Sequence, residues 1–373
     1  MNKQYDSIVV GGGVIGCSIA FQLSKRGHRV LVVEKDRIGQ KASSAAAGML
    51  GAQNEIKEDS PLLSMAKESR AIFPELAEEL RELSHIDIEL IQSGILRVAR
   101  SEREMAELEA AAAYQQAMGE TAEYLDAVQV KEKEPEISSA VIGGLYMPND
   151  GQISPPLLTE ALARSAAVLG TEFMEYTEVV AFIEDDGKIS GVQTGAGTFH
   201  ADSVIVAGGA WSRQLIEKIG LSLDAHPVKG ECFSVRHHSQ LVTSSIFSSS
   251  GYIVPKAGGR LIIGATEQPG TFDESVQLES LHQMMDSAME IIPRLKEAKW
   301  EKCWAGIRPQ TGDGLPYLGE HPSISGLFLA TGHYRNGMLL APITGLWMAD
   351  LVEGKKADDR FRVDRLPYKE VNI

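Results

Sequence analysis

The pattern of apolar positions near the start of the chain predicts a βαβ unit. Residues 7–10 and 29–33 form two short apolar runs, which are typical of buried strands. Between them stand three consecutive glycines, and then apolar residues recur at helical spacing from Cys17 to Lys25, with Gly27 placed to end the helix. A strand, a glycine turn, a helix and a second strand in this order form one βαβ unit.

Further along, apolar residues at helical spacing and short apolar runs predict a mixed α/β order. Ser154 followed by Pro155 is a typical helix start, and Pro342 suggests the start of the last helix. The expected helices cover residues 61–84, 102–118, 154–169, 212–219, 274–291 and 341–352. Residues 86–90 and 94–98 are expected to pair as strands. Further strands are expected at 172–174, 178–183, 189–193, 198–200, 204–207, 253–254, 261–263, 300–307 and 327–331.

The order of these elements indicates two domains. The βαβ-like pieces lie at both ends of the chain, and the middle is rich in strands. We therefore expect an α/β fold in which a Rossmann-like nucleotide-binding domain is built from discontinuous segments and a second, α+β domain is inserted. The length of 373 residues also favours two domains over one.

Composition and charge exclude several classes of protein. The chain is 43% hydrophobic and 23% charged, with a net charge of −15, which argues against a nucleic-acid or anionic-membrane surface. No apolar run reaches the length of a membrane span, so we expect a cytoplasmic protein that uses no membrane. Cys17, Cys232 and Cys303 form no CxxC pair, and we expect each to be a buried small hydrophobe. The nine scattered histidines suggest no metal site.

The glycine turn is the first feature that carries chemistry. Gly11 permits the tight turn, Gly13 lets the backbone approach a pyrophosphate, and Gly16 lets the helix pack closely on the strand. Glu34 lies 23 residues after Gly11, at the end of the second strand, where a carboxylate can accept hydrogen bonds from both hydroxyls of an adenosine ribose. The motif predicts a dinucleotide and disfavours NADP, but by itself leaves FAD and NAD open.

Three further segments bear on the cofactor. Residues 41–50 are a run of small side chains in which Ser43 and Ser44 can reach phosphate or ribityl oxygens. Residues 202–211 form an apolar strand that ends in the pair Gly208-Gly209, and residues 332–342 read GHYRNGMLLAP.

Together these segments resemble the amine-oxidising FAD oxidoreductases, the family that includes D-amino-acid oxidase and monomeric sarcosine oxidase. Within it the sequence is most similar to the bacterial glycine oxidases of thiazole biosynthesis. The resemblance covers essentially the whole chain and is carried by residues 44–51, 228–232, 252–255, 304–309 and 332–337. It implies an FAD-binding domain over 1–85, 140–220 and 310–373, and a substrate-binding domain with an antiparallel sheet over 86–139 and 221–309.

The resemblance also implies roles for individual residues. Arg308 would clamp the substrate carboxylate, since arginine offers a planar two-point fork. Tyr252, Arg335 and Met49 would line the same pocket. The cofactor would contact Gly11, Gly13, Val14, Ile15, Gly16, Glu34, Lys35, Ser43, Ser44, Ala47, Gly48, Met49, Val179, His333, Tyr334, Arg335, Asn336, Gly337, Met338 and Leu339.

The expected reaction is oxidative deamination of glycine, sarcosine or small D-amino acids. A hydride passes to flavin N5 without a dedicated protein base, and O2 is reduced to hydrogen peroxide. Sarcosine oxidases attach flavin to a cysteine near the position of Arg308, but this chain has none after Cys303, so FAD is expected to be non-covalent. Glu267 stands where relatives can carry an apolar residue; near the pocket it would disfavour bulky apolar or acidic substrates.

Other functions remain open on the sequence alone. A D-amino-acid or proline dehydrogenase of the same fold would use an acceptor other than oxygen. A hydroxy-acid oxidase would use the same arginine clamp, and a flavin-binding scaffold would do no chemistry. The resemblance further implies a homotetramer and a possible thiazole synthase partner.

Overall fold

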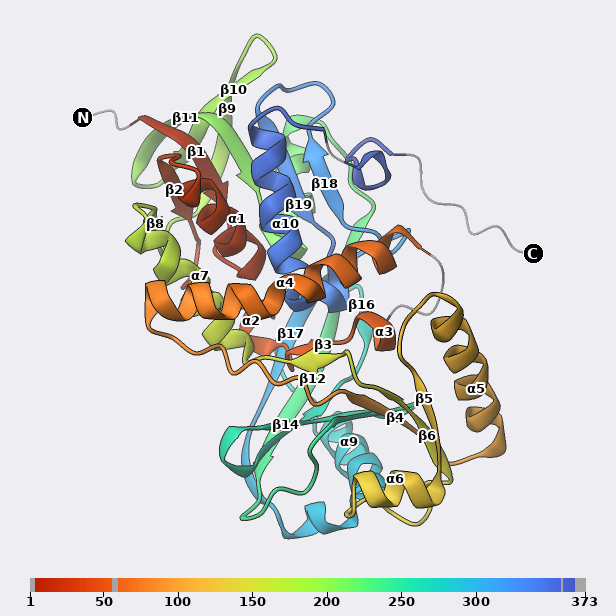
Figure 1. The fold of residues 1–373 in the computed structure, drawn as a ribbon. Coiled ribbons are helices and arrows are strands. Elements are labelled where there is room, and N and C mark those ends of the chain that lie inside the picture. Colours follow the sequence, from red (N-terminus) through yellow and green to blue (C-terminus); the bar gives the residue numbers. More distant parts are fainter. Residues whose placement is uncertain (1–3, 56–59, 357, 366–373) are drawn as a thin grey trace.

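Two large β-sheets organise the molecule, one in the upper and one in the lower half of Figure 1. The computed structural model describes residues 4–55, 60–356 and 358–365. Within those residues the first sheet has eight strands and the second nine. Among them, no helix is both long enough and apolar enough to cross a membrane.

The first sheet has a parallel centre. Its strands run in the order β18-β19-β11-β1-β2-β8, and the β9–β10 hairpin is joined to β11. β1 lies parallel to both β2 and β11, so the βαβ unit predicted at the start of the chain is present. The strands are β1 (Gln4–Val10), β2 (Val30–Val33), β8 (Glu172–Met174), β9 (Val179–Asp185), β10 (Lys188–Thr194), β11 (Gly197–Val206), β18 (Tyr317–Glu320) and β19 (Leu327–Thr331).

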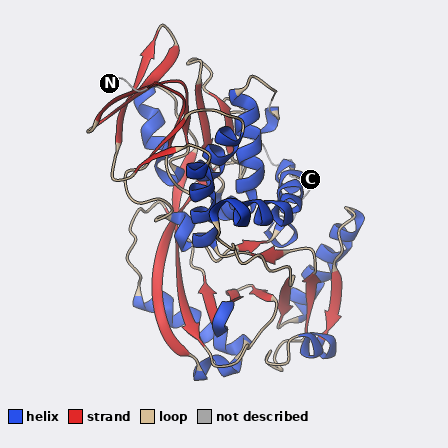
Figure 2. Ribbon diagram, turned by 60° about the vertical axis from the view of Figure 1, so that its left-hand side comes forward, coloured by secondary structure: helices blue, strands red, loops and turns tan. Residues whose placement is uncertain are grey.

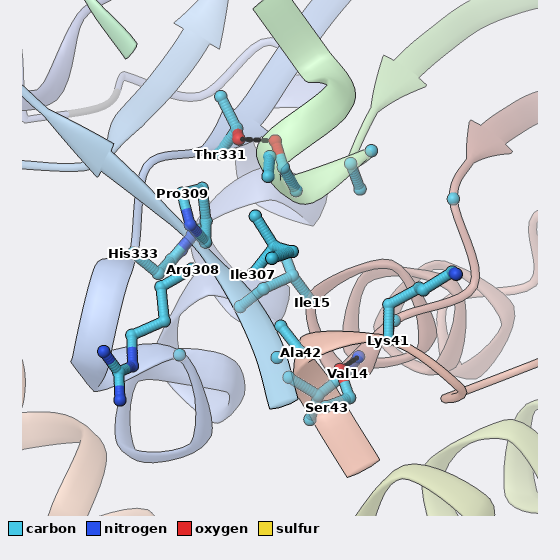
Figure 3. Close-up of a pocket in the computed structure, with 18 of the residues that line it drawn as sticks. Val14, Ile15, Lys41, Ala42, Ser43, Ile307, Arg308, Pro309, Thr331 and His333 are labelled. Atoms are coloured by element: carbon cyan, nitrogen blue, oxygen red, sulfur yellow. Dashed lines mark hydrogen bonds between the residues drawn. The ribbon is translucent and has the colours of Figure 1, made fainter. Parts of the chain in front are cut away.

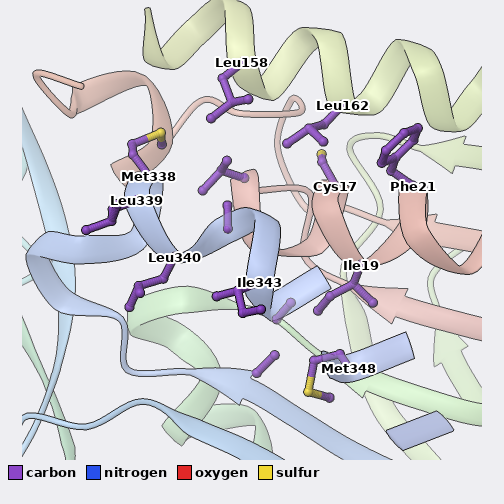
Figure 4. Close-up of a cluster of buried hydrophobic side chains, with 14 of the residues drawn as sticks. Cys17, Ile19, Phe21, Leu158, Leu162, Met338, Leu339, Leu340, Ile343 and Met348 are labelled. Carbon is purple, nitrogen blue, oxygen red and sulfur yellow. The ribbon is translucent and has the colours of Figure 1, made fainter. Parts of the chain in front are cut away.

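Four helices pack together beside the first sheet: α1 (Val14–Lys25), α4 (Pro61–Ser84), α7 (Pro155–Val168) and α10 (Gly337–Val352). Figure 4 shows the apolar cluster that joins them, with Phe21 of α1 near Leu162 of α7 and with Ile343 of α10 below. These side chains are buried almost completely, and burial of this kind is the main stabilising contribution in a fold. A short helix, α8 (Ser212–Ile216), follows β11.

The second sheet is mostly antiparallel and carries three helices, α5 (Glu102–Ala117), α6 (Ala127–Lys133) and α9 (Leu278–Ile291). Its strands are β4 (Ile95–Ala99), β5 (Glu123–Asp126), β6 (Gly143–Met147), β12 (Ala225–Arg236), β13 (Ser245–Ser248), β14 (Gly251–Lys256), β15 (Arg260–Gly264), β16 (Gln268–Pro269) and β17 (Lys299–Thr311). β12 and β17 pair over their whole length and form the long ribbon that rises through Figure 2.

Short elements connect the two halves. They are α2 (Ala42–Ala45), β3 (Met49–Leu50), α3 (Ala52–Glu55) and β7 (Gly151–Gln152), and β3 pairs with β7. The predicted α/β fold class is confirmed. The predicted division into domains stays a prediction, and we propose one adjustment: because β6 pairs with β4 and β5, the segment that returns to the first sheet begins after Met147.

Two expectations about local structure are wrong. Residues 86–90 do not pair with 94–98: Glu89 has a left-handed backbone (φ 55°), Ile88 is buried among the helices, and β4 pairs with β6 and β13 instead. Cys303 is exposed rather than buried, because it lies in the exposed first half of β17.

The last helix also begins earlier than predicted, at Gly337, so that Pro342 lies inside it. Proline has no N–H to donate and disturbs the helical ladder. Pro342 itself offers no N–H to the carbonyl of Met338, and a hydroxyl from a neighbouring helix bridges the next step of the ladder: the N–H of Ile343 donates to Ser69 Oγ (3.4 Å). The Oγ of Ser69 donates to the carbonyl of Leu339 (2.6 Å), and the Oγ of Ser18 donates to the carbonyl of Ala341 (2.7 Å). Tertiary contacts thus let the helix continue through the proline.

Candidate functional site

A long cavity lies at the carboxyl ends of β1, β2, β11 and β19 and extends to β17 of the second sheet. In open α/β sheets this edge is where ligands bind. Figure 3 shows residues from both halves around the cavity, with Lys41 at one side of the view and Arg308 at the other. The cavity is therefore formed by both sheets together.

The glycine turn between β1 and α1 leaves no space for side chains. A Cβ added to Gly11 would stand 2.5 Å from the carbonyl oxygen of Ala207, and one added to Gly16 would stand 1.9 Å from that of Gly11. Gly11 also has a φ of +113°, which favours glycine. The turn thereby brings the first residues of α1 to the cavity. The first N–H groups of a helix have no intrahelical acceptor, and this first turn holds no acidic residue, so it suits an anion.

Glu34 holds its carboxylate beside this turn. Its Oε2 accepts a hydrogen bond from the N–H of Gly12 (2.6 Å), and its Oε1 accepts one from the N–H of Asp36 (2.8 Å). Nearby, the ammonium group of Lys35 lies 4.2 Å from the centre of the Trp211 ring. Glu34, Lys35, Trp211 and Val179 all line this end of the cavity.

The small-residue segment after β2 packs along the cavity. Ser43 Oγ accepts a hydrogen bond from the N–H of Val14 (2.9 Å), which ties the segment to the start of α1 (Figure 3). Ser44 donates instead to the carbonyl of Gly39 and is not part of the cavity lining among the described residues. Trp304 Nε1 donates to the carbonyl of Ala45 (2.9 Å), which joins α2 to β17.

The C-terminal segment forms another wall. His333 is fully buried, its Nε2 lies 3.0 Å from Thr344 Oγ1, and burial lowers its pKa to about 3. A pKa this low means that the ring holds a proton only weakly, so His333 is neutral at physiological pH and is a poor candidate for a catalytic base. Gly337 and Met338, at the N-terminus of α10, line the cavity, and the helix dipole there favours negative charge.

At the end beside β17, Arg308 and Tyr252 face the cavity. Nη1 of Arg308 donates to the main-chain oxygen of Thr266 (3.2 Å), and its guanidinium lies so close to Gly230 that a Cβ there would be 2.1 Å from Nη2. Among the described residues, no carboxylate lies within 4.0 Å of this guanidinium. The Tyr252 hydroxyl is 3.3 Å from the Sγ of Cys232, and burial raises the pKa of Tyr252 well above its usual value.

Arg335 differs from Arg308 in having two carboxylate partners. Its Nε lies 3.1 Å from Glu55 Oε2, and its Nη1 lies 3.1 Å from Glu267 Oε1. The Tyr334 hydroxyl donates to the same Glu267 oxygen. Glu267 is not itself in the cavity lining of the described residues, but it contacts Tyr334 and Arg335, which are.

The structure brings most of the predicted site residues together. The cavity lining includes Gly11, Gly13, Val14, Ile15, Glu34, Lys35, Ser43, Ala47, Gly48, Met49, Val179, Tyr252, Arg308, His333, Tyr334, Arg335, Asn336, Gly337 and Met338. Among the described residues, it does not include Gly16, which packs on Gly11, or Leu339, which lies in the helical core, or Ser44.

Other lining residues were missed by sequence reasoning. They include Glu55, Gly230, Cys232, Thr331 and Pro309. Gly208 and Gly209 offered a signal, since a glycine pair ends a buried strand there. Gly230 lies in a segment that carries the family resemblance, but its closeness to Arg308 depends on the pairing register of β12 and β17 and could not be predicted.

These features fit a dinucleotide that spans the cavity. The α1 N-terminus suits a pyrophosphate, Glu34 suits a ribose, and the α10 N-terminus suits an electron-rich ring edge. The arrangement is that of a dinucleotide-binding α/β protein. The model of the FAD dependent oxidoreductase family matches residues 6–351, and the chain belongs to this family, so its cofactor is FAD.

Individual relatives agree with this assignment. The chain is 49% identical to a glycine oxidase of Geobacillus kaustophilus over 95% of each chain. It superimposes on the crystal structure of glycine oxidase from Geobacillus kaustophilus with a TM-score of 0.95 and 47% identity, over 98% of this chain and 100% of that one. It is also 33% identical to the bifunctional protein ThiO/ThiG of Synechocystis, over 95% of this chain but 53% of that protein.

Proposed function

We propose that the protein is an FAD-dependent oxidase that deaminates glycine, and also sarcosine and small D-amino acids. The observation that carries the proposal is the Arg308 guanidinium, which faces the cavity with no carboxylate partner among the described residues. A buried or half-buried cation without a counter-ion favours an anionic ligand. The similarity to glycine oxidases supports the carboxylate of an amino acid as that ligand.

The residues of the chain would orient the substrate rather than exchange protons with it. Arg308 offers two parallel N–H donors to the carboxylate, and the Tyr252 hydroxyl is available beside it. The small residues Ala47 and Gly48 would leave room along the cofactor. The low pKa of His333 makes it a weak proton acceptor, and its ring is bonded to Thr344, so the substrate amine would lose its proton to solvent before reacting. Catalysis then rests on position and electrostatics.

FAD, when bound, supplies the chemistry by accepting the hydride of the substrate α-carbon and passing two electrons to O2. Glycine, O2 and water then give glyoxylate, ammonia and hydrogen peroxide, which balances atoms and electrons. FAD would be held without a covalent bond: Cys232 Sγ lies beside the Tyr252 hydroxyl, and Cys303 is outside the cavity lining of the described residues.

We further propose a place for this reaction in thiazole formation. The bifunctional protein ThiO/ThiG joins a part similar to this chain to a second part of about equal length. That arrangement supports transfer of the glycine imine to a thiazole synthase partner. We also propose that the protein forms a homotetramer, as the family resemblance implies.

The test measures hydrogen peroxide when aerated, FAD-loaded protein meets glycine, sarcosine or D-alanine. We expect peroxide with all three, and a fall in kcat/KM of about a hundredfold or more in R308K, because lysine keeps the charge but not the fork. R103K, on an exposed turn of α5, is the matched control and is expected to match the parent. A yellow protein that reduces its flavin with glycine but makes no peroxide would point to another electron acceptor instead.

A further inference from the structure

We propose that Glu267 is a specificity-determining residue. Together with Glu55 it neutralises Arg335, so that a ligand carboxylate is received at Arg308 and a second carboxylate is rejected. The site then takes amino acids with one carboxylate and excludes dicarboxylic ones. This inference rests on the proposed function, because it concerns the substrates of the same cavity.

Arg335 is held between two carboxylates. The separations are 3.1 Å to Glu55 and 3.1 Å to Glu267, and the side chains of Arg335 and Glu55 are 30% and 13% exposed. Two carboxylates against one guanidinium leave a surplus negative charge at this edge of the cavity. The Glu267 side chain is 49% exposed and its charge is partly screened, whereas Glu55 is nearly buried, so the negative charge acts on a ligand only at short range.

Tyr334 fixes the position of Glu267. Its hydroxyl donates to the Glu267 carboxylate, and its backbone adopts a left-handed conformation with φ of 46°. Non-glycine residues adopt this conformation at a cost, and such residues cluster at ligand sites. Burial raises the pKa of Glu267, but the Tyr334 hydrogen bond and the charges of Arg335 and Arg308 outweigh it and hold that pKa below the ordinary value, so the carboxylate is charged at neutral pH.

The residue before Glu267, Thr266, contacts Arg308 without adding a negative charge. Arg308 receives from it only a neutral carbonyl oxygen, at 3.2 Å. Thr266 is itself fixed by Glu231: its Oγ1 accepts from the N–H of Glu231 (2.9 Å) and donates to Glu231 Oε2 (3.2 Å). Two consecutive residues therefore give one arginine a neutral oxygen as its direct partner and the other a carboxylate.

The consequence for a ligand follows from these charges. An amino acid with one carboxylate can pair with Arg308 and need not approach Arg335. A second carboxylate directed to Arg335 would have to displace Glu267 and would then face Glu55 as well. Like charges at such short distances repel strongly, which is a common way for a site to reject a competitor.

The experiment compares mono- and dicarboxylate probes on FAD-loaded, full-length protein. The dissociation constants of acetate and malonate are measured from the change in flavin absorbance, and kcat/KM is measured for glycine and D-aspartate. In E267Q we expect malonate to gain at least tenfold over acetate, and D-aspartate to gain at least tenfold over glycine. E55Q is expected to act in the same direction, and the double variant E55Q/E267Q is expected to show the largest gain.

The control is E107Q, which removes one exposed charge on α5 and is expected to leave both ratios unchanged. Unchanged ratios in E267Q and in E55Q/E267Q, with FAD still bound, would overturn the proposal. If the parent protein oxidised no amino acid while the malonate ratio still shifted in E267Q, the proposed oxidase function would fail and the assignment of Glu267 would stand. If the protein oxidised glycine but the malonate/acetate and D-aspartate/glycine ratios were unchanged in E267Q, the oxidase function would stand and the assignment of Glu267 would fail.

Discussion

The end of the cavity beside β1 and β2 depends on a tightly packed glycine turn, whereas the end beside β17 depends on how charged side chains pair. We call the first the glycine end (Gly11 and Gly13 in the lining, with Gly16 packed behind them and Glu34 beside the turn) and the second the arginine end (Arg308, Arg335 and Glu267). Two positions of the glycine end tolerate no added volume, since a Cβ on Gly11 would stand 2.5 Å from a carbonyl oxygen and one on Gly16 would stand 1.9 Å from another. The arginine end depends on the balance of charge.

The difference indicates how each end can change. Backbone positions cannot move without disturbing the βαβ unit, so the glycine end should be sensitive to single methyl groups and insensitive to remote charges. Charged side chains can be exchanged without moving the backbone. The arginine end should therefore respond to charge changes with altered substrate affinity while FAD stays bound.

The largest effect is expected for G16A. The added methyl meets the main-chain oxygen of Gly11, which cannot swing away, so overpacking would cost at least about 1–3 kcal/mol and would distort the turn. We expect FAD affinity to fall at least a hundredfold and the melting temperature to fall with it. Flavin content after gel filtration and thermal unfolding measure both. G195A, where no atom lies within 4 Å of the new Cβ, is the control; normal flavin content in G16A would contradict the comparison.

The next largest effect is expected at the arginine end, for a residue that helps to position Arg308. In E231Q, Thr266 loses a charged acceptor and the buried Lys229 loses a partner at 3.2 Å, so the carbonyl that orients Arg308 is less well fixed. Because Arg308 would bind the carboxylate equally before and during the reaction, we expect KM for glycine to rise about tenfold with kcat nearly unchanged.

D273N is the matched control for E231Q. Asp273 is the half-exposed partner of Lys229, at 3.0 Å, and forms no hydrogen bond with Thr266 in the described part of the chain. KM should therefore stay close to that of the parent. An equal rise of KM in both variants would indicate general loosening of the buried pair rather than a role in positioning Arg308.

The next prediction concerns the free energy of unfolding rather than ligand binding, and the residue is His333, on the wall of the cavity. Its pKa is about 3 in the folded chain, against about 6.5 when unfolded, so below pH 6.5 the unfolded state takes up a proton that the folded state does not. Stability then falls as pH falls, by about 2 kcal/mol at pH 5 from this group. In H333Q we expect that loss to disappear, measured by urea unfolding at pH 7 and pH 5. A loss at pH 5 as large as that of the parent would contradict the assignment of a neutral histidine.

The smallest effect is expected on FAD affinity, and it should differ between the neighbouring residues Ser43 and Ser44. S43A removes the acceptor of the Val14 N–H and should weaken FAD binding about fivefold, the value of one hydrogen bond. S44A removes a hydroxyl bonded to Gly39, outside the cavity lining of the described residues, and should leave FAD affinity unchanged. Flavin titration of the two apoproteins measures both. Equal losses of FAD affinity in S43A and S44A would contradict a separate role for the Ser43 hydroxyl and would indicate that both changes only disturb the local backbone.

Much of the fold could be predicted because its signals are local. The helix over Pro61–Ser84 has the predicted bounds, and the βαβ unit follows from two apolar runs and a glycine turn. The last helix could not be bounded from sequence, since the hydroxyls that let it pass Pro342 come from Ser18 and Ser69, far away along the chain. The pairing of β4 likewise depends on strands that are distant in sequence.

The sequence by itself determined a dinucleotide-type glycine turn, because glycines, a terminal carboxylate and a helix start act through local backbone geometry and lie within one βαβ unit. Only the tertiary structure decided which charges are free. Arg308 and Arg335 are both arginines after apolar segments, yet one faces a carbonyl oxygen and the other two carboxylates. Ion pairing depends on distances of a few ångströms between distant segments, and those distances exist only once the two sheets have packed together.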